Sequence, residues 1–305
     1  MSAPVTVLIP AYNAAATLAR ALDSVMAQTV RPEAILVVDD GSGDSTAAIA
    51  AAHPAGARVI RHAGNRGSSA ALTTALEAAG TDLVAFLDAD DEWLPGKLAA
   101  QTAALSAEAS LVATGFVFVG ADGREVWTYG EEPAAREGVA FWKTLLEHSM
   151  IAKPTVLTRR SAIVRVGGFD PALAVAEDQD LWIRLAHDGP VRYLAQPMVR
   201  VHDAPASLMK RQSSPDRDFV LPMVERYLVR FAGELSRAEV RQIRARRYGA
   251  AARNMVGAGR ALDAVGYARV AVANGATSGP LVAAVGKAVL RGVARMGGST
   301  ASRTQ

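Results

Sequence analysis

The segment of the sequence best suited to chemistry is an acidic cluster that directly follows an apolar run. Asp88, Asp90, Asp91 and Glu92 come immediately after the apolar residues 83–87. Two carboxylates spaced two residues apart at the exit of a strand can address one divalent cation, and hard oxygen ligands suit Mg²⁺ or Mn²⁺. Such a cation would neutralise a diphosphate leaving group. Because neighbouring acids repel each other, the alternative is an acidic turn surrounded by water.

A second polar segment, residues 39–46, follows the apolar run 34–38. A carboxylate in such a loop can accept a hydrogen bond from a nucleotide base or from a sugar hydroxyl, and glycine lets a ligand approach the backbone closely. The alternative is that Asp44 or Ser45 caps the next helix and that the Asp-Gly pair forms the turn. Both can hold, because a helix cap and a ligand site can share one loop.

Alternating strands and helices are expected to position these segments. Short β-branched runs predict strands and helical spacing of apolar residues predicts helices, which together indicate crossover units and a mostly parallel sheet. Ligands of such sheets bind beyond the carboxyl ends of strands, where the two acidic segments and the pair Tyr12 and Asn13 lie. The predicted strands are 5–9, 34–38, 58–60 and 83–87, and the predicted helices are 14–28, 45–52 and 69–79.

The later part of the chain has a looser pattern. From about residue 111, apolar runs predict further strands, and after Pro205 the sequence becomes helical and rich in Ala and Arg, with a helical hairpin at 236–272. The expected elements are strands at 111–119, 155–158 and 191–202 and helices at 138–148 and 178–187.

Composition excludes several classes of protein. Half of the 305 residues are hydrophobic, enough for a real core, so a disordered chain is excluded. The chain has no cysteine, which excludes a disulfide scaffold, a Cys-ligated metal site and a thiol nucleophile. No signal peptide pattern opens the sequence, and no apolar run approaches the about 18 residues that would span a bilayer. We therefore expect a soluble, cytoplasmic protein.

Charge is distributed unevenly along the chain. Residues 1–204 hold 16 Lys/Arg and 24 Asp/Glu, a formal charge of −8, whereas residues 205–305 hold 17 and 6, a charge of +11. Residues 281–296 could form a basic amphipathic helix on the anionic inner face of a membrane. The alternative is a helix packed on the preceding domain. Nucleic acid is not an expected partner, because no recognised module is present and the basic region has few aromatic residues.

Five ordered blocks together resemble the family 2 glycosyltransferases of the GT-A fold. Five blocks at suitable spacing are far more specific than any one of them. The resemblance covers about residues 4–204. It implies an α/β GT-A fold, a Rossmann-like and mostly parallel sheet with flanking helices, with a nucleotide-binding part at about 1–110, an acceptor part at about 111–204 and a basic helical region at 205–305. The blocks are Pro10-Ala11-Tyr12-Asn13, Val38-Asp39-Asp40-Gly41-Ser42, Asn65-Arg66-Gly67, Asp88-Ala89-Asp90-Asp91, and Gly167-Gly168-Phe169-Asp170 followed by Glu177-Asp178-Gln179-Asp180-Leu181-Trp182.

The resemblance implies roles on the donor side of the site. In the family, the tyrosine of the first block packs on the nucleotide base, which implies this role for Tyr12. The second aspartate of the next block bonds uracil, which implies Asp40, with Asp39 as a support or a ribose contact. The last aspartate of the acidic block binds the metal ion and the first contacts the ribose or a metal-bound water, which implies Asp90 and Asp88. The other implied donor-binding residues are Pro10, Asn13, Asn65, Gly67 and Ala89.

The resemblance also implies the residues on the acceptor side. An acceptor hydroxyl is a poor nucleophile, so a carboxylate must take its proton as the bond forms. In the family this base belongs to the Glu-Asp pair, which implies Asp178, with Glu177 orienting the acceptor or the base. His202 matches a histidine that can reach the metal ion or the diphosphate. The alternatives are that Asp178 is only the N-cap of a helix at 179–187 and that His202 is structural.

One departure from the family pattern affects the donor side. Ala71-Leu72-Thr73 stands where the family often has Ala-Arg-Asn, so an arginine and an amide are missing, and Arg66 could replace them only in part. Trp93 and Trp182 are expected in the core.

We expect an inverting glycosyltransferase dependent on Mn²⁺ or Mg²⁺. It would move a sugar from a UDP- or dTDP-linked donor to a glycan or lipid-linked acceptor in bacterial surface polysaccharide synthesis. One alternative is a catalytically silent scaffold of the same fold that binds sugar nucleotide or glycan. A nucleotidyltransferase is disfavoured, because no Gly-rich phosphate loop follows the first strand.

Overall fold

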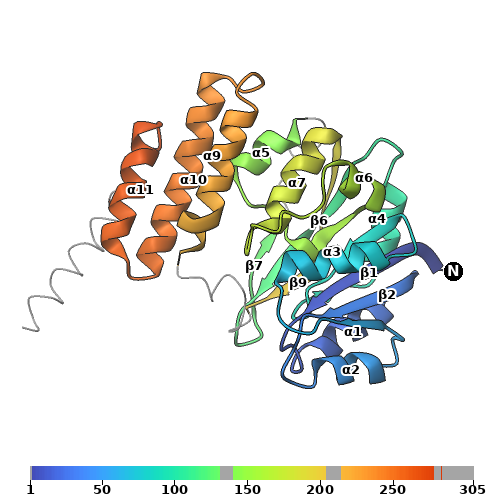
Figure 1. Ribbon diagram of the computed structural model, residues 1–305. Coiled ribbons are helices and arrows are strands. Elements are labelled where there is room, and N and C mark those ends of the chain that lie inside the picture. The colour runs from blue at the N-terminus through green and yellow to red at the C-terminus, as the bar shows by residue number, and fades with distance from the viewer. Residues whose placement is uncertain (1, 131–139, 204–213, 278–282, 284–305) are drawn as a thin grey trace, which may run out of the picture. The chain divides into compact units, whose positions relative to one another are not determined.

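The computed structural model describes residues 2–130, 140–203, 214–277 and 283 (Figure 1). The chain forms two compact units, one of residues 1–145 and 149–213 and the other of residues 146–148 and 214–305. The domain boundary expected between residues 204 and 205 falls outside the described residues.

The first half of the larger unit is a parallel sheet, as the alternation of strands and helices predicts. Its strands lie in the order β3-β2-β1-β4, and Val7 of the central strand is paired with Ile35 on one side and Ala85 on the other. The strands are β1 (Ser2–Ala11), β2 (Arg31–Asp39), β3 (Arg58–Arg61) and β4 (Leu83–Phe86), and the helices are α1 (Leu18–Met26), α2 (Thr46–Ala52) and α3 (Ser68–Ala78).

The second half makes the sheet mixed. It continues from β4 in the order β8-β6-β9-β5, with β7 paired to β6, and β8 runs antiparallel to both of its neighbours. The start of β8 therefore lies at the edge of the sheet where β4 ends. The strands are β5 (Glu92–Trp93), β6 (Leu111–Val119), β7 (Glu125–Tyr129), β8 (Val156–Arg159) and β9 (Val191–His202). The helices are α4 (Lys97–Ala104), α5 (Phe141–Glu147), α6 (Arg160–Arg165) and α7 (Glu177–Asp188), with a 3-10 turn at Lys153–Thr155.

The core lies on both faces of the sheet. Val7 and Ile9 of β1 pack with α1 on one face, whereas Phe86 of β4 meets Trp182 of α7 on the other, with ring centroids 5.4 Å apart. Strands buried on both faces are typical of a parallel sheet covered by helices, and Figure 1 shows α3 and α7 opposite α1 and α2. Trp93 and Trp182 are 2% and 1% exposed, so both are core residues as predicted.

The smaller unit is helical, as predicted. A capping box starts its longest helix: the hydroxyl of Ser236 accepts from the backbone of Glu239, whose carboxylate accepts from Ser236 N. Small side chains such as Ala252 and Ala264 let the next helix pack closely, which forms the expected hairpin. Its helices are α9 (Leu221–Arg230), α10 (Arg237–Gly257) and α11 (Ala261–Ala273), preceded by a π-helical turn at Asp216–Val220.

The helix predicted at 281–296 lies outside the described residues. Among the helices that are described, none is both long enough and apolar enough to cross a membrane.

Candidate active site

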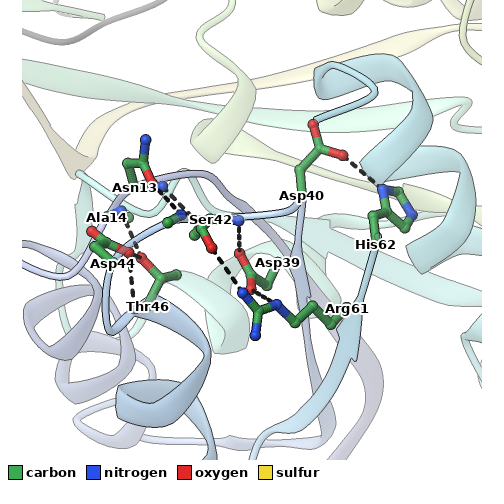
Figure 2. Close-up of polar contacts among 10 residues, drawn as sticks. Asn13, Ala14, Asp39, Asp40, Ser42, Asp44, Thr46, Arg61 and His62 are labelled. Carbon is green, nitrogen blue, oxygen red and sulfur yellow. Dashed lines mark hydrogen bonds and ion pairs between the residues drawn. The ribbon is translucent and has the colours of Figure 1, made fainter. Parts of the chain in front are cut away.

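The loops after β1 and β2 are joined by hydrogen bonds through Asn13 (Figure 2). The backbone N–H of Asn13 donates to Ser42 Oγ at 2.9 Å, and its side-chain oxygen accepts from Gly43 N at 2.9 Å. Asn13 has a positive φ of 51°, a conformation that Asn tolerates better than most residues. Tyr12 beside it is 36% exposed, and Pro10 is half-buried. The first block thus presents Tyr12 at the surface, where a base could stack.

Asp39 and Asp40 are both buried but have different partners. Asp39 Oδ1 accepts from Ser42 N at 3.0 Å, and Oδ2 lies 3.0 Å from Arg61 Nε. Arg61, at the end of β3, also donates to the carbonyl of Ser42 at 2.8 Å. Because the Arg61 side chain is 58% exposed, it presents a cation at the rim of this loop. Asp39 thus contacts its own loop and Arg61, and its role as a support or a ribose contact stays a prediction.

The carboxylate of Asp40 holds the loop that follows β3. His62 Nδ1 lies 2.7 Å from Oδ1, and the backbone N–H groups of Arg66 and Gly67 donate at 3.0 and 2.8 Å. Asn65, of the same loop, is exposed. Both carboxylate oxygens of Asp40 already contact groups of the protein itself. The implied contact of Asp40 with uracil stays a prediction. Sequence reasoning missed His62, which stands directly after β3 and two residues after the predicted strand 58–60.

Gly41 shows why these loops need glycine. It has a φ of +74°, and a Cβ added there would lie 2.5 Å from the backbone of Gly64. Any side chain at this position would push the two loops apart.

The three aspartates after β4 differ in environment. Asp88 is 27% exposed, and its Oδ1 lies 2.9 Å from Lys153 Nζ. Burial and the charge of Asp88 raise the pKa of Asp90 to about 6. Asp91 is buried and accepts from His202 N at 2.8 Å, and burial raises its pKa as well. Arg20 of α1 donates to the backbone carbonyl of Asp90 and so fixes the loop. Ala89, between the acids, is buried.

His202 lies at the same edge of the sheet as the acidic cluster. β9 ends beside β5, and His202 Nε2 lies 3.0 Å from Glu92 Oε1. The ring therefore contacts Glu92 in this structure. Within the described part of the chain, no three His, Cys, Asp or Glu side chains are grouped so as to hold a metal ion.

The Glu-Asp pair lies in the first turn of α7. The N-cap is Ala176, in the left-handed region with a φ of 63°, so the suggestion that Asp178 is only the N-cap is wrong: the helix starts one residue earlier than predicted. Glu177 is buried and its Oε1 accepts from Ser68 Oγ at 2.7 Å. Burial and the charge of Glu177 raise the pKa of Asp178 to about 7, against the opposing effect of Lys153. A carboxylate with this pKa can accept a proton near neutral pH.

Lys153 connects the two groups of acids, and sequence reasoning missed it. It belongs to the turn before β8, and the antiparallel pairing of β8 with β4 brings it beside Asp88. Burial disfavours its charge, but Asp88 and Glu177 outweigh that effect and raise its pKa above the ordinary value. The available signal was a single charge within a stretch that is otherwise uncharged and mostly apolar, residues 149–158.

Comparison with known proteins agrees with this geometry. Residues 6–167, more than half of the chain, match the model of glycosyl transferase family 2. The chain belongs to that family. Among curated relatives, an uncharacterised glycosyltransferase of Rickettsia typhi is 28% identical over 207 residues, covering 66% of this chain and 64% of the relative.

Two further relatives come from Rhizobium meliloti. The succinoglycan biosynthesis protein ExoU is 41% identical over 97 residues, 31% of this chain and 28% of its own length. The succinoglycan biosynthesis protein ExoO is 32% identical over 186 residues, 57% of this chain and 53% of its own length. The chain thus matches less than two thirds of the length of these relatives.

Solved structures share the fold. A structure of S. aureus TarS in complex with UDP-GlcNAc has a TM-score of 0.63 and 21% identity, and covers 80% of this chain and 70% of that one. A structure of the same protein in complex with UDP has a TM-score of 0.56 and 18% identity, and covers 90% and 89%.

Proposed function

We propose that this protein is an inverting, metal-dependent glycosyltransferase that uses a UDP- or dTDP-linked sugar. One observation carries the proposal: Asp88, at the exit of β4, and Glu177, beside Asp178 at the start of α7, contact the same lysine ammonium. The carboxylates suited to a metal-bound diphosphate therefore lie close to a carboxylate suited to act as a base. The UDP ligands of the TarS structures support a nucleotide-linked donor of this kind.

The acidic cluster fits a divalent cation. Asp88 Oδ1 is taken by Lys153, and Oδ2 makes no hydrogen bond within the described residues. The raised pKa of Asp90 indicates a partly buried carboxylate close to a second negative charge, which a cation would stabilise. Mg²⁺ is typically bound through one or two carboxylates together with substrate phosphates, so a cage of three protein ligands is not needed. Bound at Asp90, Mg²⁺ or Mn²⁺ would stabilise the negative charge of the departing diphosphate.

His202 is proposed as a further ligand. It lies at the same edge of the sheet, and its ring would have to leave Glu92 to reach a cation at Asp90.

Asp178 is proposed as the base. Its carboxylate would take the proton of the acceptor hydroxyl while that oxygen attacks the anomeric carbon and the nucleoside diphosphate leaves from the opposite face. Such a single displacement inverts the anomeric centre and needs one base, not the carboxylate pair of a retaining hydrolase. Glu177 is unsuited to this role, because Ser68 and Lys153 already contact its Oε1.

The proposal also covers the acceptor substrate and the place of the enzyme in the cell. The names of ExoO and ExoU support a glycan or lipid-linked acceptor in the synthesis of a bacterial surface polysaccharide. The charge of +11 over residues 205–305 supports a peripheral contact of a cytoplasmic enzyme with an anionic membrane face.

A screen of nucleotide sugars tests the proposal. Thermal shifts with and without Mn²⁺ should single out one UDP- or dTDP-sugar, and that donor should then release nucleoside diphosphate only when Mn²⁺ or Mg²⁺ is present. Binding without turnover would instead support the silent scaffold. Release of pyrophosphate would support a nucleotidyltransferase, and turnover unchanged by EDTA would refute the metal dependence.

A further inference from the structure

Lys153 is a buried cation whose contacts come from three separate elements. Its ammonium lies 2.9 Å from Asp88 Oδ1, 3.4 Å from Glu177 Oε1 and 3.4 Å from Ser68 Oγ. Its side chain is only 10% exposed. Asp88 follows β4, Ser68 begins α3 and Glu177 begins α7. One side chain therefore joins the donor side of the site to the helix that carries the proposed base.

We propose that Lys153 is a positioning residue that fixes Asp88 and the first turn of α7 relative to each other. This inference rests on the proposed function, because it assigns Asp178 on that turn as the base.

The three partners account for the whole donor capacity of the ammonium. A lysine ammonium has three N–H donors and no acceptor, and the protein supplies three oxygen atoms within reach. Lys153 therefore has no donor left for a substrate phosphate in this arrangement. It acts through Asp88 and Glu177, not by contact with the reacting atoms.

The two carboxylates depend on Lys153 in different ways. Asp88 is 27% exposed, and its Oδ2 makes no hydrogen bond to the residues that the structure describes, so the lysine holds one oxygen and sets the direction of the other. Glu177 is 5% exposed at the side chain and needs a positive partner to remain charged out of water. Without that partner, the buried carboxylate of Glu177 loses its contact and must turn away, which moves the turn on which Asp178 lies.

The turn that carries Lys153 is itself held firmly. The carbonyl of Pro154 accepts from Trp93 Nε1 at 2.9 Å, and the carbonyl of Thr155 accepts from Gln101 Nε2 at 2.8 Å. Trp93 and Gln101 are both buried. A lysine on so fixed a backbone can impose its position on the more exposed Asp88.

The test compares Lys153→Met, Lys153→Gln and Lys153→Arg with a matched control. Lys97 is a second buried lysine of the same unit, but its ammonium contacts the amide of Gln101 at 2.6 Å and the ring of Trp93. Lys97→Met therefore removes a buried ammonium that contacts no carboxylate. The measurements are kcat for UDP release from the donor found in the screen, the Kd of UDP with Mn²⁺, and thermal stability.

We expect Lys153→Met and Lys153→Gln to lower kcat by about 100-fold, the order of loss that follows a displacement of about 1 Å in a reacting group. The Kd of UDP should rise by much less than the loss of kcat, because Lys153 reaches the donor side only through Asp88. Lys153→Arg should recover part of kcat because it restores the charge. Lys97→Met should change stability and lower kcat far less than Lys153→Met does, because Trp93 and Gln101 keep their own bonds to the turn that carries Lys153.

Two results would overturn the inference. One is a wild-type kcat in Lys153→Met. The other is a rise in the Kd of UDP as large as the loss of kcat, which would mean that Lys153 contacts the donor itself.

A second measurement separates this inference from the proposed function. If the wild-type protein turns over no donor, the proposed function fails. Hydrogen exchange of the amides of residues 177–184 still reports on Lys153, because it needs no substrate. Faster exchange in Lys153→Met than in Lys97→Met supports the positioning role, and equal exchange refutes it.

Discussion

Replacing Asp178 by Asn tests the proposed base most directly. Asn has nearly the same shape, and its side-chain oxygen can still accept from Gln179 N, a bond of 2.7 Å in the structure. The substitution removes the negative charge and the capacity to take a proton, and it keeps the shape of the side chain. General-base catalysis contributes about 10²- to 10⁴-fold, so kcat should fall by that amount while the Kd of UDP stays nearly constant.

The pH dependence of the wild-type enzyme follows from the same group. A base with a pKa of about 7 is protonated and inactive below that pH, so kcat should fall about tenfold for each pH unit below 7 and level off above about 8. Asp178→Asn should abolish this acidic limb.

The stability of the wild-type protein should fall as pH rises towards 7, whereas its kcat should rise. A folded-state pKa of about 7, above the ordinary 3.8, means that the folded protein binds the proton more tightly than the unfolded chain does. Asp178 therefore destabilises the fold increasingly as pH rises from about 4 to 7, by at most about 4 kcal/mol. Asp178→Asn removes this effect, so its stability should exceed that of the wild type at pH 8 and differ little at pH 4.

The assays are UDP release, isothermal titration with UDP and Mn²⁺, and denaturant unfolding at pH 4 and 8. Asp188→Asn is the matched control, because Asp188 ends the same helix in an exposed ion pair with Arg165. A kcat of Asp178→Asn within about threefold of the wild type, or a large loss of UDP affinity, would contradict the assignment of Asp178 as the base.

Three further predictions concern other parts of the chain. Asp90→Asn should abolish metal-dependent turnover while circular dichroism remains unchanged, and full activity would exclude Asp90 as a metal ligand. Ala176→Gly should stabilise the protein by about 1 kcal/mol in denaturant unfolding, because glycine accepts the positive φ without strain. The control Ala174→Gly lies outside the positive-φ positions and should lose about 0.5–1 kcal/mol. Deletion of residues 281–305 should reduce sedimentation with anionic liposomes, and the membrane proposal fails if the intact protein does not sediment with them.

The sequence by itself predicted the local elements well. Short β-branched runs and helical spacing of apolar residues located the four strands and three helices of the first half, and the structure confirms each of them within a few residues. The hairpin of α10 and α11 was also predicted, because its apolar spacing and its glycine breaks are local features. The ordered motifs identified family 2, which the family match confirms.

The sequence also indicated where the polar residues of the site would gather. Parallel strands end at the same edge of a sheet, so Asp40 after β2 and Asp88 after β4 had to lie at that one edge. The actual partners of these side chains were beyond prediction. Asp40 is buried by His62 and by the loop at residues 65–67, and no local pattern contains that contact.

Tertiary structure alone decided how the two groups of acids are joined. Strand β8 enters the sheet antiparallel between β4 and β6, and this pairing brings Lys153 to Asp88 and Glu177. In the same way, the pairing of β9 with β5 brings His202 to Glu92 and Asp91. A local pattern gives the face that a strand buries, because side chains alternate along it. It does not give the neighbour beside which the strand lies, because that choice depends on packing between distant segments.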